Sequence, residues 1–443
     1  MQNQGIRDAR SLGTPKLLVL GLQHMFAMFG ATVLVPALTG LSVSATLLFA
    51  GLGTLFFHFL TKGKVPAFLG SSFAYLAGYA AIAPNGEAAL LPYACVGVAA
   101  SGLLYLILAA LVRGFGANRV MRFFPPVVTG PIIICIGMTL ANSAINNCTG
   151  SWDIALVAIL TVVIFNIWGK GMLRIIPILL GVLVSYVYAA VTGRVDFSGV
   201  ASAAWIGLPV KMENTVFSLI GNCDANLLVT AIIAIMPIAF ATMIEHIGDI
   251  CAISSTVGAN FIADPGLHRT LLGDGLATSI ASLFGAPANT TYGENTGVLA
   301  LTRVYDPLVI RLAAVYAIIA SFCPKFAALD SAMPTGTIGG VSLILYGMIS
   351  AIGVRNLVEN RVDLAKSRNV IVVSLIISLA LGITFSAAGA ITFHVGEFTL
   401  NFSGLAVAAI VGIVVNAILP GKDYNFQNDY EYGKTTEDHG QML

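Results

Sequence analysis

The chain has 443 residues, of which 57% are hydrophobic and only 10% are charged. Soluble domains carry about 25% charged residues, and a soluble chain with so few charges would expose large apolar patches and aggregate. The composition therefore indicates an integral membrane protein in contact with the lipid bilayer. The formal net charge of +1 offers no basic excess for nucleic acid, and the six cysteines form no CxxC pair, so we expect no nucleic-acid partner, metal site or cofactor.

A succession of apolar segments runs from residue 17 to residue 419. A helix needs about 20 mainly apolar residues to cross the hydrocarbon core. Twelve segments satisfy this rule, and two others, 65–83 and 286–302, are apolar but interrupted by polar and small residues. Counting both predicts fourteen spans, at 17–38, 42–61, 65–83, 90–112, 124–146, 152–168, 174–192, 228–251, 267–285, 286–302, 307–323, 334–353, 369–388 and 403–419.

The basic residues test this count. With fourteen spans and both termini in the cytoplasm, 19 of the 22 lysines and arginines fall in cytoplasmic segments, and only Arg194, Lys211 and Lys325 fall outside. Such a bias is the positive-inside pattern of membrane proteins. Omitting either interrupted segment would invert every later loop and remove the bias. We therefore expect both segments to count in the topology.

The longest polar connection, 193–226, divides the chain into halves of seven spans each. An odd number of spans per half gives the halves opposite orientations, as in transporters built from inverted repeats. The interrupted segment is third in each half, and each contains a run of two hydroxyl residues, an aromatic and a small residue, at 71–74 and at 290–293. We therefore predict an all-α membrane fold of two inverted repeats, followed by a polar cytoplasmic tail over 421–443.

Two acids lie close to the end of the eighth expected span. Glu245 and Asp249 are four residues apart, so they share one face of a helix. A charged side chain at the bilayer centre costs about 2.5–3.5 kcal/mol on insertion scales, and burial favours the protonated carboxyl. A carboxylate that changes protonation near neutral pH could couple transport to protons. The alternative is that the span ends early, which would make both acids cytoplasmic rim charges. The adjacent His246 is offset from both acids, and we expect it to be a satisfied packing or capping residue.

Glu294 lies in the second interrupted segment, in a stretch without an apolar face. Six of the eight residues from 289 to 296 are polar, and their pattern predicts extended backbone followed by a helix that starts near Asn295 or Thr296. Non-helical backbone at membrane depth is tolerated only where protein or a cavity satisfies it, and free N–H groups at a helix start can donate to a ligand. An extracellular loop is the alternative, but it would misplace Arg303 in the charge pattern.

The first half offers similar groups in Ser71, Ser72 and Phe73, which alone would be typical of a packing stripe of small residues. His24 is a lone histidine within the first apolar run. Carboxylate acceptors, backbone donors and an aromatic face suit a small planar solute that has both N–H and C=O groups. The residues therefore predict a secondary transporter for a small polar solute, and several heterocycles fit this description.

Other classes of membrane protein fit the residues less well. An intramembrane enzyme would need a nucleophile–base pair or clustered metal ligands, and neither HExxH nor GxSxG occurs, so we expect no catalytic residues. A channel would need no proton-binding carboxylate. An anion carrier would replace the acidic pair by neutral or basic groups.

The chain resembles the nucleobase–ascorbate transporter family over about residues 17–420. The family signature, Gln or Glu followed by Asn-x-Gly, four residues, Thr and a basic residue, has its counterpart in the run from Glu294 to Arg303. The run Asn-Thr-Thr-Tyr-Gly-Glu-Asn that starts at Asn289 resembles the uracil-transporting branch, where many purine-transporting members have Gln-Asn. Further similar segments are 23–32, 65–73, 245–248, 339–340 and 346–347.

The resemblance implies a division of the fold into two domains, with short antiparallel strands in spans three and ten. The core domain would comprise 17–115 and 222–330, and the gate domain 120–195 and 331–420. It also implies a multi-pass protein of the bacterial cytoplasmic membrane, and family members often form homodimers through the gate domain.

The resemblance also implies which residues contact the solute. Uracil would bind to the carboxylates of Glu245 and Glu294 and to the backbone amides of Phe73 and Gly293, with Tyr292 beside it. Residues around the site would be His24, Ser72, Asn295 and Tyr346.

One position departs from the best-studied uracil transporters of the family. They have a histidine, implicated in proton coupling, four residues after the equivalent of Glu245, and this chain has Asp249. A carboxylate would then be the proton relay here, with Asp249 or Glu245 in that role. The expected function is proton-coupled uracil uptake by alternating access, and a proton-coupled purine (xanthine) symporter of the same family is the alternative.

Overall fold

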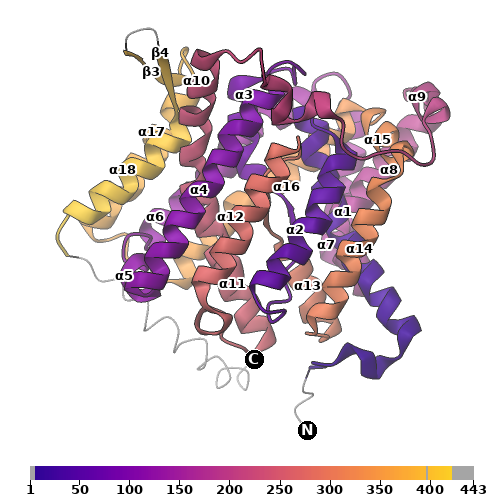
Figure 1. The fold of residues 1–443 in the computed structure, drawn as a ribbon, viewed down its shortest axis with the longest axis horizontal. Helices are drawn as coiled ribbons and strands as arrows, with labels where there is room; N and C mark the ends of the chain where they lie inside the picture. Colours follow the sequence, from indigo (N-terminus) through magenta and orange to yellow (C-terminus); the bar gives the residue numbers. More distant parts are fainter. Residues whose placement is uncertain (1–4, 396–397, 422–443) are drawn as a thin grey trace.

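The computed structural model describes residues 5–395 and 398–421, so the tail expected over 421–443 lies outside the described residues except for Gly421. The described chain is mostly helical (Figure 1). Its strands are β1 (Leu69–Ser71), β2 (Asn289–Thr291), β3 (Ala390–Val395) and β4 (Phe398–Ser403). Its α-helices are α1 (Thr14–Thr39), α2 (Val43–Leu60), α3 (Leu76–Ile82), α4 (Leu91–Phe115), α5 (Ala117–Met121), α6 (Pro126–Cys148), α7 (Trp152–Trp168), α8 (Pro177–Val191), α9 (Ser198–Ser202), α10 (Ala225–Ile235), α11 (Ala239–Val257), α12 (Leu267–Leu283), α13 (Gly293–Thr302), α14 (Pro307–Ser321), α15 (Pro324–Ser331), α16 (Thr335–Glu359), α17 (Ser367–Thr384) and α18 (Gly404–Ile418).

Seven helical segments in the described part of the chain are long and apolar enough to cross a membrane. An eighth crossing results if α14 and α15, which meet at a bend of 81°, form one broken span. Four further apolar helices have 10–17 residues. The chain is therefore a multi-pass membrane protein, and fourteen crossings stay a prediction.

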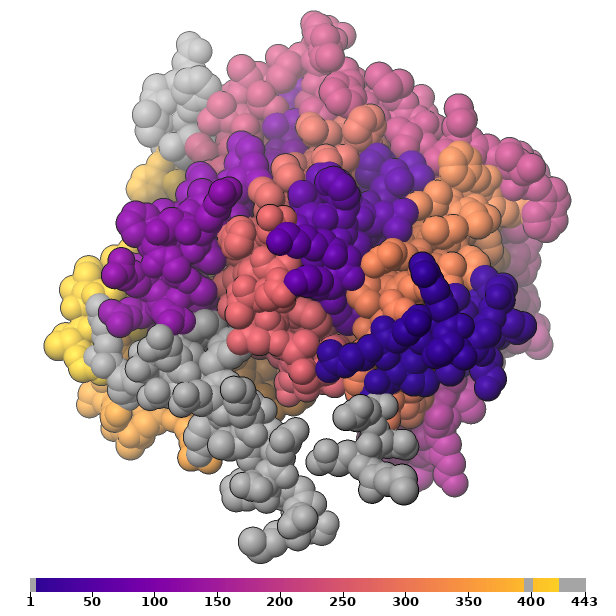
Figure 2. Space-filling view, turned by 60° about the horizontal axis from the view of Figure 1, so that its bottom comes forward, coloured from indigo at the N-terminus to yellow at the C-terminus, as the bar shows by residue number. Residues whose placement is uncertain are grey.

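The long helices run between two ends of the molecule (Figure 1). One end carries α9, α15 and the β3–β4 hairpin, and the other carries α5 and the N-terminal segment before α1. Figure 2 looks obliquely onto this second end, where the indigo N-terminal segment lies beside orange parts of the chain. This agrees with the packing of α1 against α14.

The helices pack in two groups. In one group, α2 packs against α12 and α14, α4 against α10 and α12, and α1 against α14. In the other, α16 packs against α6, α7 and α8, and α17 packs against α6 and α18. Glycines allow the close approach of α6 and α16, because a Cβ atom on Gly137 would lie 2.2 Å from the carbonyl oxygen of Tyr346.

The two interrupted segments meet in the interior as a short antiparallel ladder, which we call the strand crossing (β1 and β2). Leu69 pairs with Thr291, Gly70 with Thr290 and Ser71 with Asn289. The extended backbone predicted after residue 288 is thus confirmed at β2, as are the strands expected in segments three and ten. Neighbouring helices form hydrogen bonds with the outer edges of the ladder. Thr54 Oγ1 on α2 accepts from the Leu69 N–H at 2.8 Å, and the Thr278 hydroxyl on α12 donates to the Asn289 carbonyl at 2.9 Å. This satisfies backbone groups that lipid could not.

Two features of the fold differ from the sequence-based expectation. The eighth span was expected as one helix over 228–251, but the chain forms α10, a 3₁₀ turn over Met236–Ile238 and α11, which continues to Val257. Pro237 lacks the N–H that a continuous helix needs there. The β3–β4 hairpin was not expected at all, although its β-branched and aromatic residues are typical of strands.

Candidate functional site

Each strand of the crossing leads directly into a helix start. The 3₁₀ turn Phe73–Tyr75 and α3 follow β1, and α13 follows β2 from Gly293, two residues earlier than predicted. Neither helix start has a side-chain cap. Among the described residues, the N–H groups of Phe73 and Gly293 have no protein acceptor. Two sets of N–H donors, with the positive ends of two helices, are therefore available for a ligand.

Tyr292 is fixed against β1 by two hydrogen bonds and by close packing of its ring. Its N–H donates to the Phe68 carbonyl at 3.0 Å, and its hydroxyl donates to the Ser71 carbonyl at 3.0 Å. The ring lies against Gly70, where an added Cβ atom would approach to 2.4 Å. Only 4% of Tyr292 is exposed. The residue thus fixes the geometry of the loop that carries Gly293, and its contact with a ligand stays a prediction.

Three carboxylates approach these helix starts. Glu245 and Asp249 lie in the middle of α11, and Glu294 is the second residue of α13. The helix does not end at these acids, because α11 continues for eight residues beyond Asp249. All three side chains are half-buried and lie within electrostatic range of one another.

Asp249 has a defined hydrogen-bond partner on the strand crossing. The Thr291 hydroxyl donates to Asp249 Oδ2 at 2.7 Å. This bond joins α11 to β2, so a change in the charge of Asp249 would alter a hydrogen bond of the strand crossing. Thr291 itself was expected only as part of the polar stretch.

Open space lies beside the acids. Gly248 on α11 and Gly293 and Gly297 on α13 are exposed, and a Cβ atom at any of them would meet no neighbouring atom within 4 Å. The backbone next to the acids is therefore free of close packing at these three positions.

His24 and Asn295, both expected beside the site, contact each other. Asn295 Nδ2 lies 3.2 Å from His24 Nδ1 and donates to the His24 carbonyl at 3.1 Å. Both residues are fully or almost fully buried, and His24 Nε2 and Asn295 Oδ1 have no partner in the described structure. These contacts connect α1 to the first turn of α13.

Ser72 and Tyr346, which the resemblance places around the site, have contacts at the start of the segment that follows β1. The Ser72 N–H donates to the Ala288 carbonyl at 2.8 Å. The buried hydroxyl of Ser72 has no described protein partner. The rings of Phe73 and Tyr346 pack edge to face with centroids 6.4 Å apart. Since Tyr346 belongs to α16, this contact joins the strand crossing to the second packing group.

The sequence reading did not identify Asp274 as a site residue. Asp274 on α12 is fully buried, and its Oδ2 lies 3.1 Å from Nδ1 of the equally buried His246, although the atoms are not aligned as a hydrogen bond. The expectation that His246 packs in the interior is correct, and Asp274 is its partner. The available signal was that Asp274 is the only acid in the expected span 267–285.

The arrangement combines acceptors and donors around one space. Carboxylates of α11 and α13 can accept from N–H groups of a ligand, and the helix starts at Phe73 and Gly293 can donate to its carbonyl oxygens. Among the described residues, no group of three or more His, Cys, Asp or Glu side chains is placed to hold a metal ion. The site suits a small polar solute.

A solved structure shares the fold. The transmembrane domain of the cyanobacterial bicarbonate transporter BicA aligns with a TM-score of 0.58 at 14% sequence identity, over 93% of this chain and 98% of that chain. The described helices and this likeness define a multi-pass membrane protein of the same fold.

The sequence comparisons identify the family. The family Xan_ur_permease, described as a permease family, matches residues 15–389, and the chain belongs to this family. It is 42% identical to the uracil permease of Bacillus caldolyticus, over 96% of both chains. It is 40% identical to the uracil permease of Bacillus subtilis strain 168, over 99% of this chain and 98% of the relative.

Proposed function

We propose that the protein carries uracil across the bacterial cytoplasmic membrane together with protons, by alternating access. The observation that carries the proposal is the meeting of two uncapped helix starts and three half-buried carboxylates beside open space. The substrate follows from the near full-length similarity to the two Bacillus uracil permeases. The protein acts as a transporter and performs no catalysis.

Uracil has ring N–H donors and carbonyl acceptors, and the site offers a partner for each kind. Glu245 and Glu294 accept from the ring N–H groups, and the Phe73 and Gly293 N–H groups donate to the carbonyl oxygens. Because helix starts carry positive potential, they also stabilise partial negative charge on those oxygens. Tyr292 and the His24–Asn295 pair hold the loops that present these groups.

Protons bind in this scheme to Asp249 or Glu245. Three carboxylates in electrostatic range repel one another when all are charged, so proton binding relieves the repulsion. A proton bound at Asp249 also alters its bond with Thr291, and thereby links proton binding to the strand crossing.

Alternating access requires two bodies that move relative to each other. In the proposal, the core comprises 17–115 and 222–330, the gate comprises 120–195 and 331–420, and each half of the chain is one of two inverted seven-span repeats. The two helix packing groups support this division. Both termini lie in the cytoplasm, and two copies associate through the gate.

The structural neighbour BicA is a bicarbonate transporter, and bicarbonate is an anion. The site of this chain disfavours an anion. Glu245, Asp249 and Glu294 surround the space, and an anion would face their repulsion in a medium that screens charge poorly.

Equilibrium binding of labelled uracil to the purified protein tests the site. Glu245→Gln and Glu294→Gln should each weaken binding at least ten-fold, because a hydrogen bond to a charged group contributes about 1.5–3 kcal/mol. Glu213→Gln, in the exposed 3₁₀ turn Met212–Asn214, is the matched control and should bind normally. Unlabelled uracil should displace the label more effectively than xanthine, thymine or adenine. Failure of excess unlabelled uracil to compete would refute the substrate assignment.

A further inference from the structure

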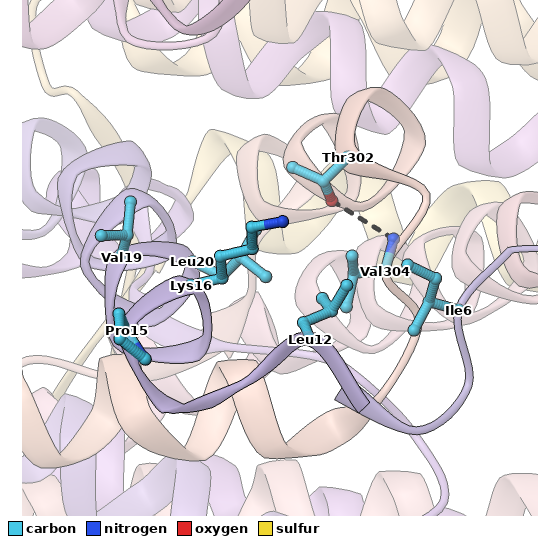
Figure 3. A pocket seen from close by; sticks show the side chains of 8 residues that line it. All are labelled: Ile6, Leu12, Pro15, Lys16, Val19, Leu20, Thr302 and Val304. Carbon is cyan, nitrogen blue, oxygen red and sulfur yellow. Dashed lines mark hydrogen bonds between the residues drawn. The ribbon is translucent and has the colours of Figure 1, made fainter. Parts of the chain in front are cut away.

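A hollow lies outside the candidate site, where the N-terminal segment meets the end of α13 (Figure 3). It has a volume of about 450 Å³ and is open on one side. Residues from α1, from the segment before it and from the end of α13 line it: Ile6, Leu12, Pro15, Lys16, Val19, Leu20, Thr302 and Val304. Cavities of about 300–1,000 Å³ are large enough for drug-sized ligands.

Lys16 is the one charged residue of this lining. Its side chain extends from α1 toward Thr302 in Figure 3, across apolar neighbours. Within the described residues, its ammonium group forms no hydrogen bond or ion pair. An apolar hollow with one unpaired cation complements a ligand that has an apolar chain and an anionic head.

The surroundings indicate where such a ligand would come from. Leu18, Val19, Leu22 and Phe26 on α1 are each at least 40% exposed and continue from the hollow along the helix. The hollow lies at the end of the molecule that the proposed topology places in the cytoplasm. Lysines at this level of a membrane attract anionic lipids of the cytoplasmic leaflet.

We propose that this hollow binds one anionic phospholipid, with its phosphate on Lys16 and the upper part of an acyl chain against Leu12, Val19 and Leu20. The inference goes beyond the proposed transport activity and does not depend on the substrate.

The bound lipid would also lie against a segment that is hydrogen-bonded to the chain after α13, the helix that starts at the candidate site. The segment over residues 5–12, which we call the N-terminal strap, is fastened to the chain that follows α13. The Ile6 N–H donates to the Arg303 carbonyl, and the Tyr305 N–H donates to the Ile6 carbonyl, both at 2.8 Å. The Ala9 N–H donates to Asp306 Oδ2 at 2.8 Å. A lipid between the strap and α1 therefore stabilises the far end of the helix that begins at Gly293.

Native mass spectrometry of the purified full chain tests the proposal, with dioleoyl phosphatidylglycerol or dioleoyl phosphatidylcholine added. The wild-type chain should retain phosphatidylglycerol in preference to phosphatidylcholine. Lys16→Gln should weaken phosphatidylglycerol retention about five-fold, the effect expected for one lysine near an anionic lipid surface. Lys16→Arg should retain it, and Arg119→Gln, an exposed cation on α5 at the same end, is the matched control.

Equal phosphatidylglycerol retention by the wild-type chain and Lys16→Gln would contradict the proposal. So would equal losses in Lys16→Gln and Arg119→Gln, because the effect would then be one of general surface charge. If phosphatidylglycerol bound only after the acids at 423, 429 and 431 were neutralised, the acidic C-terminal segment would be the occupant and the proposal would be wrong.

Discussion

At the scale of single residues, the contact between His246 and Asp274 is buried in the interior next to the acids of the candidate site. Both side chains are fully buried, and no hydrogen-bond partner is described for either. Asp274 also lies within electrostatic range of Glu245 and Asp249. It therefore adds to the negative potential that the acids of α11 experience, without bordering the open space itself.

Asp274→Asn should lower the melting temperature of the purified protein markedly. Removing the partner of a buried polar group leaves that group without compensation for its lost hydration, which costs about 1–3 kcal/mol. The double variant His246→Gln/Asp274→Asn should lose less than the sum of the single variants, with a coupling of about 0.5–3 kcal/mol. Strict additivity in thermal unfolding would contradict the pairing.

An exposed pair, Lys64 and Asp264, makes a contrasting pH-dependent contribution. It joins the turn after α2 to the turn before α12, and the hydrogen bond from Lys64 holds the pKa of Asp264 below its ordinary value. A carboxyl whose folded-state pKa is depressed stabilises the fold above its unfolded pKa, and the contribution disappears as pH falls through the folded pKa. The loss therefore begins below about pH 4.

Lys64→Gln should lower the melting temperature slightly at pH 7, because exposed ion pairs contribute little. The difference from the wild-type protein should shrink as the pH falls below about 4 and Asp264 becomes protonated. Thermal unfolding of both proteins across this range measures it. A difference that grew toward low pH would show that the pair does not act in this way.

At the scale of elements, the strand crossing depends on close packing of Tyr292 against Gly70. Gly70→Ala would place a methyl group 2.4 Å from the ring, so the ladder or the ring must move. Overpacking of this kind costs about 1–3 kcal/mol. We expect a lower melting temperature and weaker uracil binding, since Gly293 follows Tyr292 directly. Gly382→Ala, where a Cβ atom meets nothing within 4 Å, is the control, and equal behaviour of the two variants would contradict the role of this contact.

The sequence predicted most elements well and their interruptions less well. Long apolar runs such as 91–115 have one structural solution in a bilayer, so their helices were predictable. The extended backbone at 289–291 was predictable from β-branched residues. Its pairing with 69–71 depends on contacts between distant residues, and it was expected only from the family resemblance. The continuation of α11 to Val257 was missed because polar residues near its end resemble a helix terminus.

The candidate site was predictable for a related reason. Glu245, Asp249 and Glu294 were conspicuous because charges are rare in apolar segments. Asp274 was overlooked because its neighbours are small residues and Arg269 lies in the same segment. The contact of His24 with Asn295 joins residues 271 positions apart, and no local pattern encodes it.

At the scale of the whole molecule, the proposed topology assigns each connection to one side of the membrane. Cys223, an exposed cysteine in the connection before α10, falls on the outside. A membrane-impermeant maleimide should therefore label it in intact cells. Cysteine introduced as Arg119→Cys in a Cys223→Ser background falls on the inside and should be labelled only after permeabilisation. The reverse pattern would invert the topology and remove the basis of the fourteen-span count.

The central claim is that uracil moves together with protons, and uptake of labelled uracil into proteoliposomes tests it most directly. With an imposed gradient, acidic outside, the wild-type protein should accumulate uracil above the external concentration, and a protonophore should abolish the accumulation. Asp249→Asn should bind uracil but lose the response to the gradient. Uptake that is the same with and without the gradient in the wild-type protein would contradict proton coupling, and a full gradient response in Asp249→Asn would remove Asp249 from the mechanism.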